Sequence, residues 1–387
     1  MATEVGRRDR PGGCPSMVAA AIEPRRTPRR SGPWRSLIVG LAILAAPGCH
    51  TVPIAGKIQA DASVKAGFSG TVDVRVPPVS DPGPVVPVVI RGGAAGPQQS
   101  PRVAVIDVDG LLVNQNQTGL YSAGENPVAT FREKLGAAGC DPRVRAVVLR
   151  INSPGGGVAA SDLMAEELRR FRQETGKPVV ACLLDVATGG AYYLAVGCDR
   201  VVALPTTITG AIGALVNHAN LLDAMSQLNV KVETVKSANL LDMGSVTAPL
   251  SDDARALFKE MAEGFGQRFA ARVARQRPAM SAADRKVIGD GRIVPATRAL
   301  ALHMIDVLGY PDDAVSEAGR LAGINGPEVV LFQRTGYPAR SIYATVPNVP
   351  LQSDLIPFSY PGLDRSKLPT FLYLWQPDPT LARHAGH

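Results

Sequence analysis

Short apolar runs alternate with amphipathic stretches through the middle of this 387-residue chain. Residues 146–151 are apolar at nearly every position, which is the pattern of a strand buried on both faces. A glycine-rich turn follows at 152–157, and residues 158–175 then repeat apolar side chains at helical spacing until Gly176. The order of strand, glycine turn and helix recurs over 178–193. This alternation predicts an α/β fold with a largely parallel sheet flanked by helices.

The chain outside this region has a different composition. Residues 50–100 are rich in Pro and Gly and predict a tether, with one short strand at 70–76. Residues 336–387 form a Pro-rich, aperiodic tail in which Phe371-Leu-Tyr-Leu-Trp375 is a candidate docking segment. The folded domain is therefore expected over 101–335, with strands at 103–108, 200–204 and 230–235 and helices at 127–138, 219–228 and from Ser251 onward.

The first 49 residues have the pattern of an export signal. Five arginines between 25 and 35 precede an apolar run at 37–46, which is about half the roughly 20 residues that a membrane-spanning helix needs. Small residues then lead to Cys49, an arrangement that resembles a bacterial lipobox. We expect a signal peptide over 1–49 and a lipid anchor on Cys49, which would place the protein in the bacterial envelope facing the periplasm. A plain signal peptide with an incidental cysteine is the alternative, and a start at Met17 would preserve either signal.

The charge and the metal-binding residue types exclude two classes of function. The net charge is +7, but the first 48 residues hold eight arginines against three acidic residues, which leaves +2 for the rest. That excess is too small for a nucleic-acid footprint. The five histidines and five cysteines are scattered without metal-ligand spacing, so neither a metal nor a cofactor is expected.

The two glycine turns have the backbone chemistry of an anion site. Glycines between a strand and a helix expose N–H groups at the helix N-terminus, where negative charge is favoured. Such a turn holds a phosphate or the oxyanion of acyl transfer, although most turns of this form are structural. Turns from neighbouring strands, here 152–157 and 188–190, converge at the carboxyl edge of a parallel sheet.

A set of motifs in fixed order makes a family resemblance specific. The motifs are Leu149-Arg-Ile-Asn-Ser-Pro-Gly-Gly156, Lys177-Pro-Val-Val, Asp185-Val-Ala, Gly190-Ala-Tyr-Tyr193, Asp199-Arg-Val-Val-Ala, Pro205-Thr-Thr-Ile-Thr-Gly-Ala-Ile-Gly213 and Asp290-Gly-Arg-Ile-Val294. Together they resemble the signal peptide peptidase A (SppA) family of membrane-associated bacterial serine peptidases, over about residues 101–335. The resemblance implies a ClpP/crotonase-like fold.

Members of this family use a serine nucleophile and a lysine base, and this chain has neither at the matching positions. Alignment on Tyr192 and Tyr193 places Gly189 at the serine, and the segment from Val235 to Ser245 places Leu241 at the lysine. Two substitutions at the two reacting positions indicate a degenerate dyad. The resemblance leaves Gly155, Gly156 and Gly190 as an oxyanion or peptide-binding frame.

Two enzymatic readings remain as alternatives. Thr188 is a substitute nucleophile if the motif shifts by one residue, with Lys236 as the nearby amine. That protein would be an active peptidase for signal-peptide remnants or other envelope peptides. A crotonase-type acyl-CoA enzyme would stabilise an oxyanion in the same way, but that function conflicts with the export signal.

The expected partners are peptides, the membrane through the lipid anchor, and further copies of the chain. Family members assemble into rings, and in single-domain forms the lysine comes from the neighbouring subunit. Apolar residues at 257, 261, 265 and 269 form a stripe on the helix after Ser251, compatible with a homo-oligomer.

Overall fold

The computed structural model describes residues 83–334, apart from 97–98, 116 and 120–121, together with residues 371–375. The chain divides into two compact units, Met1–Pro77 and Pro78–His387, and all described residues belong to the second. The expected signal peptide, the lipidation site at Cys49 and the strand at 70–76 lie outside the described residues.

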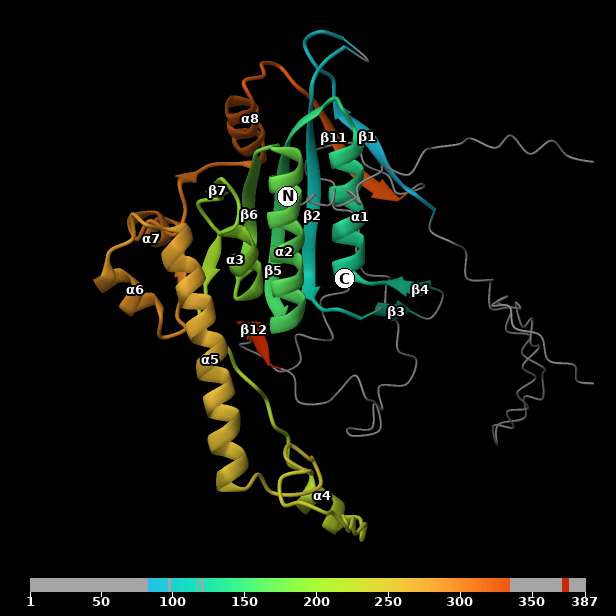
Figure 1. The fold of residues 1–387 in the computed structure, drawn as a ribbon, viewed down its shortest axis with the longest axis vertical. Coiled ribbons are helices and arrows are strands. Elements are labelled where there is room, and N and C mark those ends of the chain that lie inside the picture. Colours follow the sequence, from blue (N-terminus) through green and yellow to red (C-terminus); the bar gives the residue numbers. More distant parts are fainter. Residues whose placement is uncertain (1–82, 97–98, 116, 120–121, 335–370, 376–387) are drawn as a thin grey trace, which may run out of the picture. The chain divides into compact units, whose positions relative to one another are not determined.

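A largely parallel sheet forms the centre of the described unit (Figure 1). Its main path runs β1-β11-β2-β5-β6-β7-β10, and β12 pairs with β5 while β8 joins β6 to β9. The neighbours from β11 to β10 are parallel, whereas β1, β9 and β12 are antiparallel to their partners. The strands are β1 Val85–Arg91, β2 Arg102–Leu112, β5 Val144–Gly157, β6 Val179–Thr188, β7 Arg200–Ala203, β8 Ile208–Gly210, β9 Ile293–Pro295, β10 Val307–Leu308, β11 Glu328–Arg334 and β12 Leu372–Leu374, with the separate pair β3 Gln117–Gly119 and β4 Ser122–Glu125.

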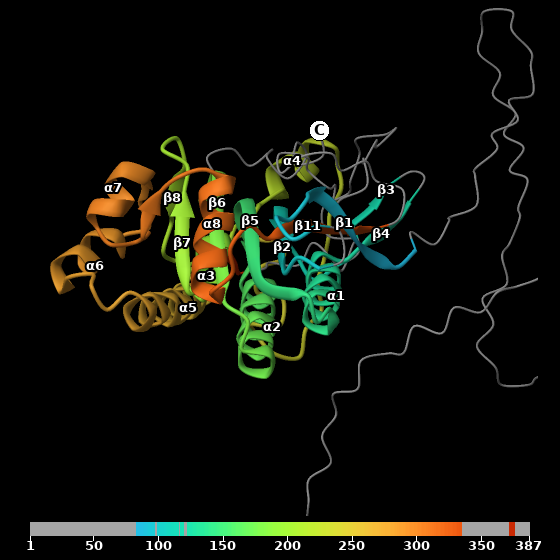
Figure 2. The same ribbon diagram turned by 90° about the horizontal axis from the view of Figure 1, so that it is seen from above.

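Helices cover both faces of this sheet, so the α/β class expected from the sequence is confirmed (Figure 2). Helices α1, α2, α3 and α5 contribute to the larger apolar core, and α8 closes the smaller core on the opposite face. The helices are α1 Pro127–Cys140, α2 Val158–Thr175, α3 Gly190–Ala195, α4 Leu222–Gln227, α5 Asp252–Gln276, α6 Ala282–Ile288, α7 Ala296–Ala301 and α8 Pro311–Ala322.

The central strands contain long apolar runs because each face of the sheet meets a different core. In β5, Val147 and Leu149 belong to the core under α1 and α2, while Ala146 and Val148 belong to the core under α8. A strand with one wet face would alternate polar and apolar residues instead. This explains why the run at 146–151 predicted a buried parallel strand correctly.

The tether expected over 50–100 is wrong for residues 85–91, which form β1. Their valine and isoleucine side chains suit a strand, and within the described ranges β1 pairs with β11 alone, at the edge of the sheet. An edge position tolerates Pro87, because proline lacks the N–H that a second neighbour would need.

The strand expected over 230–235 is also wrong. These residues have no regular secondary structure and are exposed, and Val235 keeps 93% of its accessible surface. The helix expected at 219–228 is confined to α4. Residues 216–250, which we call the arm, lie with α4 at the end of α5 farthest from the sheet (Figure 1). Among the described residues, no strand pairs with the β-branched residues of the arm.

No helix within the described ranges is long and apolar enough to cross a membrane.

Candidate functional site

Two glycine turns lie side by side at the carboxyl edge of the sheet. Strands β5 and β6 are parallel neighbours, with Ser153 opposite Ala187. Strand β5 leads through Gly157 into α2, and β6 leads through Gly189 into α3. A Cβ built on Gly155 would lie 2.8 Å from the amide nitrogen of Gly190. The expectation that the two turns converge is confirmed.

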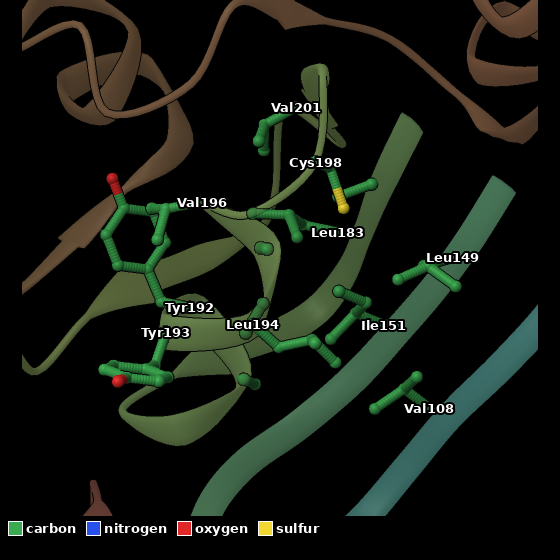
Figure 3. Close-up of a cluster of buried hydrophobic side chains, with 14 of the residues drawn as sticks. Val108, Leu149, Ile151, Leu183, Tyr192, Tyr193, Leu194, Val196, Cys198 and Val201 are labelled. Carbon is green, nitrogen blue, oxygen red and sulfur yellow. The ribbon is translucent and has the colours of Figure 1, made fainter. Parts of the chain in front are cut away.

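Burial of α3 fixes the position of the second turn. All six residues of α3 are buried, and Figure 3 shows Leu194 beside Ile151 of β5, with the rings of Tyr192 and Tyr193 on the other side. The Tyr192 hydroxyl donates to the carbonyl oxygen of Met304 at 3.0 Å. Burial raises the pKa of Tyr192, so its hydroxyl stays a neutral structural donor. The buried helix α3 therefore holds the turn at Gly189 in place.

Gly189 has the backbone of a nucleophile position without the nucleophile. Its φ of +52° and ψ of −121° form a sharp turn from strand to helix, the kind of turn from which hydrolases present a catalytic serine. Its N–H donates to the carbonyl of Gly210 at 3.0 Å, and its own carbonyl accepts from the N–H of Tyr193 at 2.9 Å. A glycine here supplies no side chain for covalent catalysis.

Thr188 and Lys236, the substitute nucleophile and base, do not hydrogen-bond to each other. Each side chain has other partners. Thr188 is fully buried, and its Oγ1 donates to the carbonyl of Pro154 at 3.1 Å. The Lys236 amine donates to the carbonyl of Asn239 at 3.0 Å and to the Asp242 carboxylate at 2.6 Å. That hydrogen bond lowers the pKa of Asp242. Both of these lysine partners belong to the arm.

Leu241 and Ser153, which the sequence analysis also singled out, lie in different environments. Leu241 lies in the arm with 68% of its surface exposed. Ser153 is fully buried, and its Oγ accepts from the N–H of Gly155 at 3.1 Å, which is the contact of a turn-stabilising residue. In the part of the chain that the structure describes, no three His, Cys, Asp or Glu residues gather in a way that would hold a metal ion.

The glycines expected to form an anion-binding frame do come together. A Cβ built on Gly190 would lie 3.5 Å from the amide nitrogen of Gly156, so the two turns meet at these residues. Gly155 has a φ of +102°, which is a region that residues with a side chain rarely adopt. The role of Gly155, Gly156 and Gly190 in binding an oxyanion or a peptide stays a prediction.

Strand β12 lies over both turns. It pairs antiparallel with the end of β5, with Tyr373 opposite Gly156, and Leu372 exchanges backbone hydrogen bonds with Leu215 on the other side at 2.9 and 3.0 Å. Residues 371–375 are the docking segment expected within the C-terminal tail, and their docking is confirmed. Their location on the site was not predicted, because sequence separation gives no information on long-range strand pairing.

Residues from three helices form an aromatic and charged cluster under β12. The ring of Tyr193 stands edge-on to Phe269, with centroids 5.2 Å apart. Its hydroxyl donates to Asp162 at 2.7 Å, and the Arg272 guanidinium lies 4.6 Å from its ring centroid. Burial, followed by the contact with Asp162, raises the pKa of Tyr193. Sequence reasoning missed Asp162 and Arg272, because a single charged residue on a helix carries no positional signal.

Comparison with known proteins identifies relatives of this chain. The model for peptidase family S49 matches residues 171–325. Protease 4 of Salmonella typhi is 29% identical over 280 residues, covering 72% of this chain and 42% of the protease. An SppA-type protein of Enterococcus faecium is 27% identical over 238 residues, covering 61% of this chain and 69% of that protein.

A solved structure, that of a membrane-bound stomatin-specific protease, is 14% identical with a TM-score of 0.38, covering 60% of this chain and 91% of that one. The chain thus spans less than half the length of Salmonella protease 4. The motifs, the α/β fold with its paired glycine turns, and these sequence relatives agree. Residues 171–325 match peptidase family S49, and the chain is similar to serine peptidases of the SppA and protease 4 type.

Proposed function

We propose that this protein binds extended peptides without cleaving them, as an SppA-family member whose serine–lysine dyad has been lost. The observation that carries the proposal is Gly189, a residue without a side chain at the tip of the strand-to-helix turn. Peptide hydrolysis by this family's route needs a nucleophile there and a neutral amine beside it. The aligned base position holds Leu241, which is an exposed residue of the arm.

Two backbone edges that pair with an extended segment support a peptide-binding role. The end of β5 on one side and Leu215 on the other hydrogen-bond to a single extended segment. Strand addition of this kind gives affinity through the main chain and selectivity through pockets for alternate side chains. Binding therefore needs neither residue of the dyad.

The test is a pair of activity measurements on the full chain. We expect no labelling by a fluorophosphonate probe and no cleavage of apolar peptides, with an active SppA-type protease as the positive control. Turnover abolished by Thr188→Ala would establish the alternative, an active peptidase with a threonine nucleophile. Turnover that survives Thr188→Ala would mean that another residue reacts. Either result contradicts the proposal.

We further propose that copies of the chain associate through the arm. Several apolar side chains there are exposed, among them Leu228 at 77%, Val235 at 93% and Leu241 at 68%. Exposed large apolar side chains, when they gather in a patch, are typical of interaction sites in soluble domains. On α5, Leu257 and Met261 are also exposed at the end toward the arm. The occupant that we expect is a second copy.

Export and lipid attachment are proposed on the sequence pattern before Cys49. In the native host, Cys49→Ser should release the protein from the membrane fraction and abolish acylation of the N-terminal cysteine, as seen by mass spectrometry. A protein that remains membrane-bound after this change would contradict the lipid anchor.

A further inference from the structure

Strand β12 is bound as a peptide ligand would be. Its backbone hydrogen bonds run to both edges of the slot, which we define as the strip between residues 155–157 and Leu215. The N–H of Val158 donates to the Phe371 carbonyl at 3.0 Å, and the N–H of Trp375 donates to the Pro154 carbonyl at 3.2 Å. Main-chain hydrogen bonds therefore run along the whole five-residue segment.

Alternate side chains of this segment enter one aromatic surface. The Tyr373 side chain is fully buried, with its ring centroid 5.2 Å from Tyr193 and 4.9 Å from Phe269, and its hydroxyl donates to the carbonyl of Phe265 at 2.8 Å. Two positions earlier, Phe371 lies 5.1 Å from the ring of Phe265. In a strand, residues two apart share a face, so the slot selects for aromatic residues at that spacing.

The slot extends beyond the residues that fill it. Leu374 lines a cavity of about 560 Å³, together with Ile212, Lys259, Glu263 and Asp290. A ligand with a larger side chain at this position would therefore gain contacts that leucine does not make.

The backbone of Tyr373 occupies the space that a side chain at 189 would need. A Cβ built on Gly189 would lie 2.2 Å from the Tyr373 carbonyl oxygen and 2.5 Å from its carbonyl carbon. A Cβ on Gly155 would lie 2.0 Å from the same oxygen. These separations are far below contact distance, so a serine at 189 and β12 in this position exclude each other.

We propose that the slot is a binding site for extended peptides with aromatic residues two apart, that its resident ligand is the chain's own segment 371–375, and that Gly189 is the substitution that admits this ligand. The proposal rests on the non-catalytic function above. In this proposal the change from serine to glycine removes the nucleophile and also opens the space that a peptide carbonyl occupies.

The experiment converts the internal ligand into an exchangeable one. A recognition site for a sequence-specific protease is inserted after residue 350 of the full chain, and the folded protein is cut there. A fluorescent peptide with the sequence Thr370-Phe-Leu-Tyr-Leu-Trp-Gln376 is added in excess. The matched control peptide has alanine at the position of Tyr373.

We expect the cut C-terminal piece to co-elute with the core and to be replaced by the fluorescent peptide. The alanine peptide should compete at least about tenfold less well, because a buried aromatic anchor dominates an interface of this size. A piece that no concentration of peptide displaces would show that β12 is a permanent strand, and equal competition by both peptides would show that the aromatic pocket does not select. Either result overturns the proposal.

A second variant keeps the chain intact. Full-length Tyr373→Ala should bind the fluorescent peptide at least about tenfold more tightly than the unaltered chain, whose slot is occupied. Circular dichroism confirms that the variant is folded, and a folded variant that binds no peptide contradicts the inference. The mass of the recovered peptide is measured in each case. Cleaved peptide refutes the absence of cleavage in the proposed function, whereas intact, unbound peptide refutes this inference and leaves the absence of cleavage standing.

Discussion

At the scale of single residues, Gly189 affects both the chemistry of the site and the packing of β12 over it. Its close contact with the Tyr373 carbonyl depends on the missing side chain. Restoring a serine would therefore supply a hydroxyl and displace a buried strand at the same time.

We predict that Gly189→Ser lowers the free energy of unfolding by about 1–3 kcal/mol, the usual range for overpacking a close-packed site. The matched control is Gly264→Ala in α5, where a built Cβ meets no atom within 4 Å. There the loss of glycine in a helix should stabilise by about 0.5–1 kcal/mol. Urea unfolding of both variants measures the difference, and equal stability of Gly189→Ser and the original chain would mean that β12 does not press on this turn.

Two buried thiols should make the stability of the folded protein fall at alkaline pH. Burial raises the pKa of Cys182 and of Cys198 to about 12, from an ordinary value near 9. The unfolded chain releases these protons above pH 9 while the folded chain keeps them, so their contribution to stability is complete below pH 9 and is lost as pH rises toward 12.

The expected slope from each thiol is about 1 kcal/mol per pH unit between pH 9 and 11. Urea midpoints measured at several pH values should fall less steeply for the double variant Cys182→Ala/Cys198→Ala than for the original chain. An unchanged slope would show that other groups dominate the alkaline transition. Both thiols should also resist alkylation until the protein is unfolded.

At the scale of elements, the sequence predicted most accurately where local pattern and burial agree. Helix α2 begins and ends where its apolar repeat and Gly176 indicated, and Ser251 caps α5 by accepting from the N–H of Ala254. The expectation failed at 230–235, where valines at strand-like spacing are exposed instead. A strand needs a partner, and the sequence of one segment does not contain that partner.

Hydrogen exchange should separate these two segments. The N–H groups of Leu372 and Trp375 donate to backbone carbonyls at the site, so peptides covering 371–375 should be protected for minutes or longer. Peptides covering 230–237 should exchange within seconds, because exposed backbone without regular hydrogen bonding opens at almost no cost. Protection of 230–237 that appears only at high protein concentration would point to an interface.

At the scale of the whole molecule, the arm exposes large apolar side chains, several of which stay mostly uncovered in a single copy of the described chain. We predict that the double variant Val235→Asp/Leu241→Asp lowers the mass measured by light scattering, since charges on an apolar interface oppose association. Both side chains are exposed, so the folded core should keep its thermal stability. A chain that is monomeric at every concentration before mutation would contradict the proposed homo-oligomer.

The sequence by itself determined the alternating strands and helices, the paired glycine turns and the absence of a serine at 189. These follow from apolar periodicity and residue identity, which are local properties. Only the tertiary structure decided what stands over those turns. A strand 184 residues downstream of Gly189, centred on Tyr373, closes on the site through main-chain hydrogen bonds and ring contacts. Main-chain pairing is available to almost any residue, so its location depends on the folded shape of the slot.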